Sequence, residues 1–118
     1  MCGIIGYVGR RPAKDLLITG LESGSIRYYS GRRTIVWDAL DSDWLDGVIR
    51  FAREQGFEPY VLLESREEPL FRSRFAKSET ARLDWPPMAD IDSKVRIFRP
   101  GDRDRYRRGI GYPTEYVR

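Results

Sequence analysis

Short apolar runs alternate with segments of helical periodicity along most of the chain, and this alternation restricts the fold more than any other feature. Glycine, proline and small polar residues separate the segments, as they do at turns. Strands separated by helices favour right-handed crossovers and a mainly parallel sheet. The sequence therefore predicts an α/β fold, a single small three-layer domain with about four mainly parallel strands and crossover helices. The strands are expected at 4–8, 33–38, 59–64 and 94–99, and the helices at 12–22, 44–55 and 67–77.

The helix expected over 44–55 has the clearest local pattern. The apolar residues of this segment recur at helical spacing and form one stripe, which consists of Trp44, Leu45, Val48, Ile49 and Ala52. Asp41, Ser42 and Asp43 offer side-chain oxygens for the N-cap. Gly56 suits the left-handed conformation of the residue that follows many helices. Together these features predict an amphipathic helix that packs on the sheet.

The positive charge of the chain is concentrated near its C-terminal end. The formal net charge is +3, and the sequence pI is about 9.2. Residues 99–118 contain six arginines against three acidic residues, so the rest of the chain sums to zero. We therefore expect an α/β domain over 1–98 and a basic, flexible tail over 99–118. This tail is expected either to be solvated or to contact an anionic partner, nucleic acid or a membrane surface.

The residue types that are missing exclude several classes of enzyme. The chain has no histidine and one cysteine, which excludes Ser-His-Asp and Cys-His catalysis, almost all zinc enzymes and internal disulfides. Its glycines are not followed by the Lys-Ser or Lys-Thr of a phosphate loop. No secretory signal and no apolar run long enough to cross a membrane is visible. We expect a soluble cytoplasmic protein without a metal or cofactor, and the sequence does not predict its oligomeric state.

The one cysteine, Cys2, follows the initiator methionine and is the candidate catalytic residue. Removal of Met1 would leave a thiol and a free α-amine on the same residue. The amine has an ordinary pKa of about 8, so a fraction of it is neutral near neutral pH and can accept the thiol proton. A nucleophile activated in this way needs no second side chain. In the structural alternative, Cys2 is a small, chemically inert residue at the start of a strand. The sequence identifies no substrate-binding residues.

The opening of the chain reads Cys2-Gly3-Ile4, and the segment from Arg10 to Leu21 continues a related pattern. These residues, within the first 22, resemble the class II glutamine amidotransferases, and in particular the glutamine–fructose-6-phosphate aminotransferase family. The resemblance implies that Cys2 attacks the side-chain amide of glutamine, forms a thioester and releases ammonia. The sugar-phosphate domains of that family need several hundred residues, and its glutamine-binding arginine and oxyanion Asn-Gly pair have no counterpart here. The resemblance therefore implies a truncated or chimeric relative, which acts as a glutamine amidotransferase if Cys2 is active.

A second resemblance extends over residues 23–98 and rests on the stretches Ser23–Arg32, Trp44–Asp46, Gly56–Tyr60, Glu67–Arg72 and Leu83–Pro87. These stretches are similar to the soluble C-terminal region of membrane glycosyltransferases of the dolichyl-phosphate-mannose type. The membrane portion that performs the transfer in that family is missing from this chain. The resemblance therefore implies no catalytic residue and predicts, as the alternative function, a non-catalytic soluble α/β accessory domain.

Three further groups of side chains are candidates for binding or catalysis. Glu64, Glu67 and Glu68 follow an expected strand, at the end where α/β proteins usually bind ligands. They could act as acid and base, or they could stabilise the next helix through its dipole. The second group combines cations and aromatic rings and consists of Arg27, Tyr28, Tyr29, Arg32 and Arg33. It could bind a phosphate or a base, or else a tyrosine packs in the core and the arginines are solvated. The third group, Asp84–Pro87, is either a packed loop or a strip that docks a partner.

Overall fold

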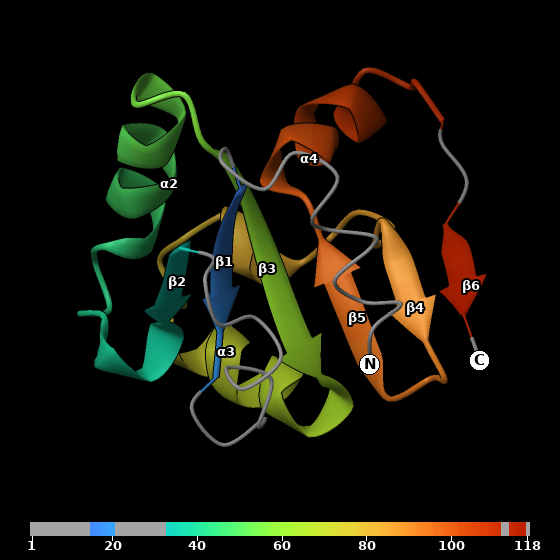
Figure 1. The fold of residues 1–118 in the computed structure, drawn as a ribbon, viewed down its shortest axis with the longest axis horizontal. Helices are drawn as coiled ribbons and strands as arrows, with labels where there is room; N and C mark the ends of the chain where they lie inside the picture. The colour runs from blue at the N-terminus through green and yellow to red at the C-terminus, as the bar shows by residue number, and fades with distance from the viewer. Residues whose placement is uncertain (1–14, 21–32, 112–113, 118) are drawn as a thin grey trace.

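The computed structural model describes residues 15–20, 33–111 and 114–117. In this part of the chain, one mixed sheet has the strand order β2-β1-β3-β5-β4-β6 (Figure 1). The strands are β1 (Asp15–Thr19), β2 (Arg33–Val36), β3 (Glu58–Glu64), β4 (Ala89–Ile91), β5 (Val95–Phe98) and β6 (Glu115–Val117). The α-helices are α2 (Leu45–Glu54), α3 (Glu68–Arg74) and α4 (Pro100–Arg107), and the short 3-10 turns are η4 (Trp37–Ala39), η5 (Ser65–Glu67) and η6 (Thr80–Arg82).

The predicted α/β class is confirmed, and the described residues form a sheet of six strands where the sequence predicts about four. β1 pairs in parallel with both β2 and β3, and β6 pairs in parallel with β4. β5 is antiparallel to β3 and to β4. Helix α2 connects β2 to β3 across β1, as expected for a crossover in a parallel sheet.

The prediction of a helix over 12–22 is wrong for the residues of it that the structure describes, because 15–19 form strand β1. Leu17 and Ile18 point to opposite faces of the sheet, and both side chains are fully buried. A run of apolar residues also fits a strand that is covered on both faces. Pairing with β2 on one side and β3 on the other favours the strand. The strand expected at 4–8 lies outside the described residues.

The other predicted elements match β2, α2, β3, α3 and β5 to within a few residues. The sequence analysis missed β4, which is only three residues long and forms a hairpin with β5. Asp92 and Ser93 at the tip of this hairpin have φ angles of 54° and 55°. Tight hairpins need residues with such positive φ angles, and Asn-Gly or Asp-Gly is the usual sequence at these positions. The Asp-Ser pair found here is a weaker indication of a hairpin.

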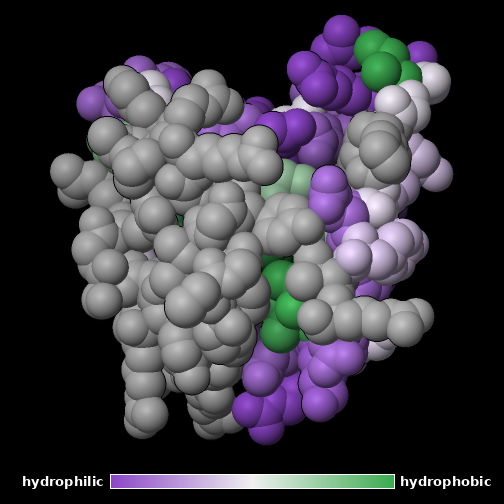
Figure 2. All heavy atoms as spheres, turned by 45° about the vertical axis from the view of Figure 1, so that its right-hand side comes forward, coloured by the Kyte–Doolittle hydropathy of each residue, from purple (hydrophilic) through white to green (hydrophobic). Residues whose placement is uncertain are grey.

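The segment after residue 99, expected to be a flexible tail, contains α4 and β6 in its described part. Pro100 starts α4, where a missing N–H is not needed. The Arg99 Nε donates to the buried Asp102 Oδ1 at 3.0 Å, and the Arg103 Nε donates to Asp84 Oδ1 at 2.9 Å. The first pair stabilises the start of α4, and the second attaches the helix to Asp84 in the body. Figure 2 shows that the surface at this end of the molecule is strongly hydrophilic.

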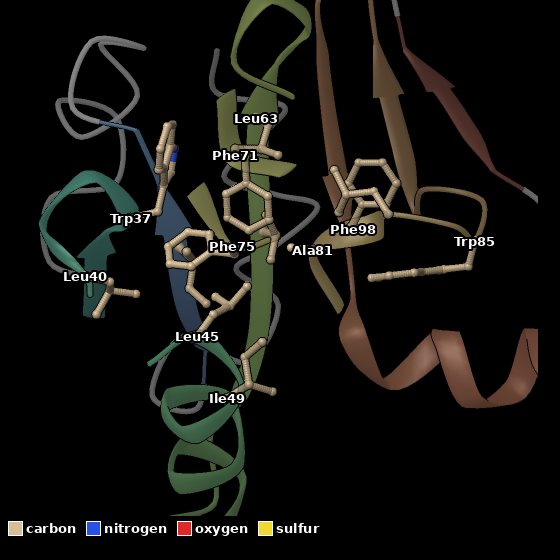
Figure 3. Close-up of a cluster of buried hydrophobic side chains, with 13 residues drawn as sticks. Trp37, Leu40, Leu45, Ile49, Leu63, Phe71, Phe75, Ala81, Trp85 and Phe98 are labelled. Carbon is tan, nitrogen blue, oxygen red and sulfur yellow. The ribbon is translucent and has the colours of Figure 1, made fainter. Parts of the chain in front are cut away.

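The larger core cluster lies on the face of the sheet that carries α2 and α3 (Figure 3). Phe71 and Phe75 are fully buried there, and Trp37 packs against Phe71 edge to face with ring centroids 5.6 Å apart. β3 is buried on both faces, since Val61 and Leu63 belong to this cluster and Tyr60 and Leu62 to the other. The second cluster consists of Leu17, Tyr60, Leu62, Ala89 and Ile97.

Candidate functional site

The carboxyl ends of β1 and β3 lie side by side where the connections of the sheet diverge. β1 is paired with β2 on one side, whereas β3 is followed by β4 and β5 on the other. In open α/β sheets, ligands usually bind outside the carboxyl ends of the strands at such a switch point. The candidate site is therefore formed by Gly20, which follows β1, and by η5, which follows β3.

Glu67 is the side chain that fills this position. It is buried, with 5% of its surface exposed. Its Oε1 accepts the backbone N–H of Glu64 at 3.0 Å, and the two residues form a reciprocal capping box around η5. Its Oε2 lies so close to Gly20 that a Cβ at position 20 would be 1.6 Å away. The Glu67 carboxylate therefore joins the end of β3 to the end of β1.

The surroundings of Glu67 favour its protonated form. Burial raises the pKa of its carboxyl above the ordinary value, and the negative charge of Glu64 adds to this effect. The Glu64 N–H and the neighbouring Trp37 indole lower the pKa, but burial has the larger effect. A buried carboxyl of this kind can hold a proton at a higher pH than an exposed one.

The neighbouring Glu68 has a different role. Its side chain is 4% exposed and takes both Nε and Nη2 of Arg96 on β5 as donors, with Nε at 2.7 Å. Arg72, one turn further along α3, lies 3.5 Å from the same carboxylate. Glu64 pairs with the exposed Arg66 at 3.1 Å. Of the three carboxylates predicted from the sequence, Glu67 thus lies against Gly20 at the switch point, whereas Glu68 pairs with Arg96 on β5.

The loop Asp84–Pro87 is packed against the body. The Asp84 carboxylate accepts two hydrogen bonds from Arg103, and this pairing lowers the pKa of Asp84. Trp85 is 3% exposed and packs edge to face on Phe98, with ring centroids 5.6 Å apart. These contacts agree with the interpretation of this segment as a packed loop.

Several predicted site residues lie outside the described part of the chain. They include the candidate nucleophile Cys2 and the group Arg27, Tyr28, Tyr29 and Arg32. Arg33 is described as the first residue of β2. The structure therefore does not test the role of Cys2 or the binding role of the cations and rings.

A cleft that the sequence analysis missed lies between α2 and α4. Its volume is about 550 Å³. Arg50 and Arg53 of α2 and Arg103 of α4 bring positive charge to it, and acidic side chains of equal number balance them. Residues far apart in the sequence meet here, so no local pattern could indicate the cleft. It is lined by Asp46, Ile49, Arg50, Arg53, Glu54, Glu79, Thr80 and Arg103.

Residues 15–20, 33–111 and 114–117 contain no group of three or more acidic, cysteine or histidine side chains that could hold a metal ion. No helix in the same residues is long and apolar enough to cross a membrane.

The chain is similar to glutamine–fructose-6-phosphate aminotransferase [isomerizing] from two strains of Streptococcus pneumoniae, R6 and TIGR4. In both cases the identity is 42% over 52 residues, which are 44% of this chain and 9% of the relative. This chain thus spans only a small part of the length of these relatives. No protein-family model matches the chain, and no solved structure matches it significantly. The predicted resemblance to the aminotransferase is supported over this short stretch, and the resemblance to the glycosyltransferases stays a prediction.

Proposed function

We propose that the chain is a non-catalytic α/β accessory domain, similar to the soluble region of a membrane glycosyltransferase, that has incorporated an amidotransferase-like beginning. The position of β1 is the observation that supports this function. Residues 15–19 belong to the stretch that resembles the amidotransferases, and they form an interior strand between β2 and β3. Leu17 and Ile18 are buried in the two core clusters. This part of the stretch thus contributes to the stability of the domain.

The carboxylates of the candidate site also support a structural role. Glu67 is engaged in the capping box of η5, and Glu68 is engaged with Arg96 and Arg72. A general acid or base must reach its substrate with a free oxygen. The Glu67 Oε2 faces the backbone of Gly20. Both buried carboxylates are thus already used to connect segments of the fold.

The first test measures glutamine hydrolysis by the purified full chain and by Cys2→Ala. An accessory domain is expected to release glutamate at the background rate in both proteins. A partner test accompanies it, because absence of activity alone does not establish a binding role. The tagged chain is expressed together with a polyprenol-phosphate-sugar-dependent membrane glycosyltransferase, and retention of that enzyme during purification is the expected result. A chain that neither hydrolyses glutamine nor retains the enzyme would contradict this function.

A second candidate function, glutamine amide hydrolysis by Cys2, is favoured by the partial similarity to the aminotransferases. In this mechanism, the Cys2 Sγ attacks the amide carbon of glutamine, and the α-amine transfers the thiol proton to the leaving ammonia. Water then hydrolyses the thioester to glutamate and regenerates the thiol. The resulting ammonia is the product that an aminotransferase would use.

Intact-mass spectrometry decides whether this mechanism is open to the chain. Loss of Met1 is required, because only then do the thiol and the α-amine belong to the same residue. Glutamate release that disappears in Cys2→Ala, together with labelling of Cys2 by a glutamine-like electrophile, would support the second function. The same result would exclude the non-catalytic role.

A further inference from the structure

The exposed end of α4 carries cations that the rest of the fold does not use. Arg99 and Arg103 are paired with Asp102 and Asp84. Arg105 and Arg108 are exposed, and neither has an ion pair with any residue in the described ranges. Arg107 is exposed and lies 4.0 Å from Glu79, which is also exposed. The excess positive charge of the chain is therefore available to a partner at this end of the helix.

A Schellman motif ends α4, and two exposed side chains with apolar groups neighbour these cations in the sequence. Gly109 has a φ of +82°, and its N–H donates to the Tyr106 carbonyl at 3.0 Å. The N–H of Ile110 donates to the Arg105 carbonyl, also at 3.0 Å. The side chains of Tyr106 and Ile110 are nevertheless 47% and 51% exposed. Figure 2 shows a hydrophobic group among strongly hydrophilic residues at this end of the molecule.

The favourable interaction of cations with a helix C-terminus accounts for part of this arrangement. Arg105 and Arg107 lie in the last turn of α4, where positive charge complements the helix dipole. This effect does not require the exposed isoleucine that follows, nor an exposed tyrosine on the same turn. Cations that flank exposed aromatic and aliphatic side chains are typical of surfaces that adsorb to the interface of an anionic membrane.

We propose that Arg105, Arg108, Tyr106 and Ile110, here called the α4 tip, bind the surface of an anionic lipid bilayer. The guanidinium groups contact lipid phosphates, and the two apolar side chains enter the headgroup region. A lipid surface is favoured over nucleic acid because Ile110 has no π face for stacking on an exposed base, whereas the headgroup region accommodates aliphatic and aromatic side chains alike. Asp104 is exposed on the same turn and reduces the local charge, so the binding is expected to be weak and sensitive to salt. This inference does not depend on the proposed function, since it rests on α4 alone.

The test is cosedimentation of the full chain with vesicles of phosphatidylcholine alone and with an equal mixture of phosphatidylcholine and phosphatidylglycerol. We expect binding to the anionic vesicles at low salt, little binding at high salt and none to the neutral vesicles. Arg105→Glu combined with Arg108→Glu is expected to weaken binding roughly thirty-fold or more, from the typical contribution of each cation near an anionic surface. Tyr106→Ser combined with Ile110→Ser is expected to weaken it several-fold at the same net charge. Arg82→Glu combined with Lys94→Glu changes the net charge equally at exposed positions elsewhere and is the matched control.

Circular dichroism of each variant shows whether α4 and the domain remain folded. The dependence of vesicle binding on salt and on lipid composition is measured with the unmodified chain, so this part of the test does not depend on the folding of any variant. Equal loss of binding in the control pair would overturn the assignment to the α4 tip. Equal binding to neutral vesicles, or no binding to either kind, would overturn the proposal itself. Tight binding of a single-stranded oligonucleotide without binding of anionic vesicles would assign the surface to nucleic acid instead.

Discussion

The carboxylate of Glu67 lies against the backbone of Gly20, so that a Cβ at position 20 would come within 1.6 Å of Glu67 Oε2. This contact joins the carboxyl ends of two adjacent parallel strands, β1 and β3. It also explains why the position after β1 is a glycine. The Trp37 Nε1 would be only 3.0 Å from the same Cβ, so the space is closed on a second side.

Gly20→Ala is expected to destabilise the domain by about 2 kcal/mol, because the added methyl group displaces the Glu67 carboxylate and leaves the Glu64 N–H without its acceptor. Urea unfolding measures the change. Gly47→Ala is the matched control, since nothing lies within 4 Å of its Cβ position and alanine is the better helix former in α2. It should stabilise the chain slightly. If Gly20→Ala combined with Glu67→Ala has the sum of the two separate effects, the contact between these residues has no energetic importance.

The stability contributed by Glu67 is expected to depend on pH. Burial raises the pKa of its carboxyl from 4.5, so the folded chain holds the proton more tightly than the unfolded chain. The free energy of unfolding should therefore fall as the pH rises from below 4.5 through the raised pKa of the folded state. Glu67→Gln replaces the titrating carboxyl with an amide that does not ionise. The stability of Glu67→Gln relative to the unmodified chain should accordingly increase with pH over the same range, and a difference that is constant with pH would show that the carboxyl is not perturbed.

Breaking the pair of Glu68 and Arg96 is expected to be costly, because the Glu68 carboxylate is almost fully buried. Arg96→Met should reduce the free energy of unfolding by about 3 kcal/mol, since it leaves a buried charge with Arg72 as its remaining cation. Glu68→Leu combined with Arg96→Met should cost less than Arg96→Met alone. Lys77→Ala, which removes an exposed ion pair at 3.8 Å, provides the comparison and should change stability by less than about 0.5 kcal/mol. Equal costs for Arg96→Met and Lys77→Ala would contradict the buried-pair interpretation.

β1 is expected to be essential for the stability of the sheet. Ile18→Ala should destabilise the chain by about 3 kcal/mol, because it opens a cavity in a fully buried position, and Ile18→Val by about 1 kcal/mol. Chemical denaturation gives both values. Asp43→Ala, at an exposed position, is the control and should have an effect near zero. Amide exchange of Leu17 and Ile18 should be as slow as that of Val61 in β3, and rapid exchange in β1 would be inconsistent with an interior strand.

Local patterns in the sequence are sufficient to predict those elements in which the spacing of the apolar residues fits only one type of secondary structure. In the predicted stripe of α2, Leu45, Ile49 and Ala52 are buried, and Val48 is partly buried. Trp44 is the exception, because it occupies the N-cap position, is 58% exposed and makes no side-chain capping hydrogen bond. The continuous apolar run in β3 indicates a strand covered on both sides. These elements were predicted because the period of the apolar residues and the burial that it requires are properties of a short segment.

Tertiary structure decided the elements for which the local pattern is ambiguous or absent. Residues 15–19 suit a helix or a strand, and pairing with β2 and β3 selects the strand. α4 has few apolar residues, and its buried Arg103 is held by Asp84, nineteen positions earlier in the chain. Glu67 and Glu68 are adjacent in the sequence, yet one faces Gly20 and the other Arg96.

The amino-acid sequence alone thus determined the α/β class, the buried stripe of α2 and the strand β3, because each depends on residues within one segment. The folded chain determined β1, α4 and the position of Glu67. These features depend on strand pairing, on ion pairs and on close approach between distant segments, which exist only after the sheet has formed.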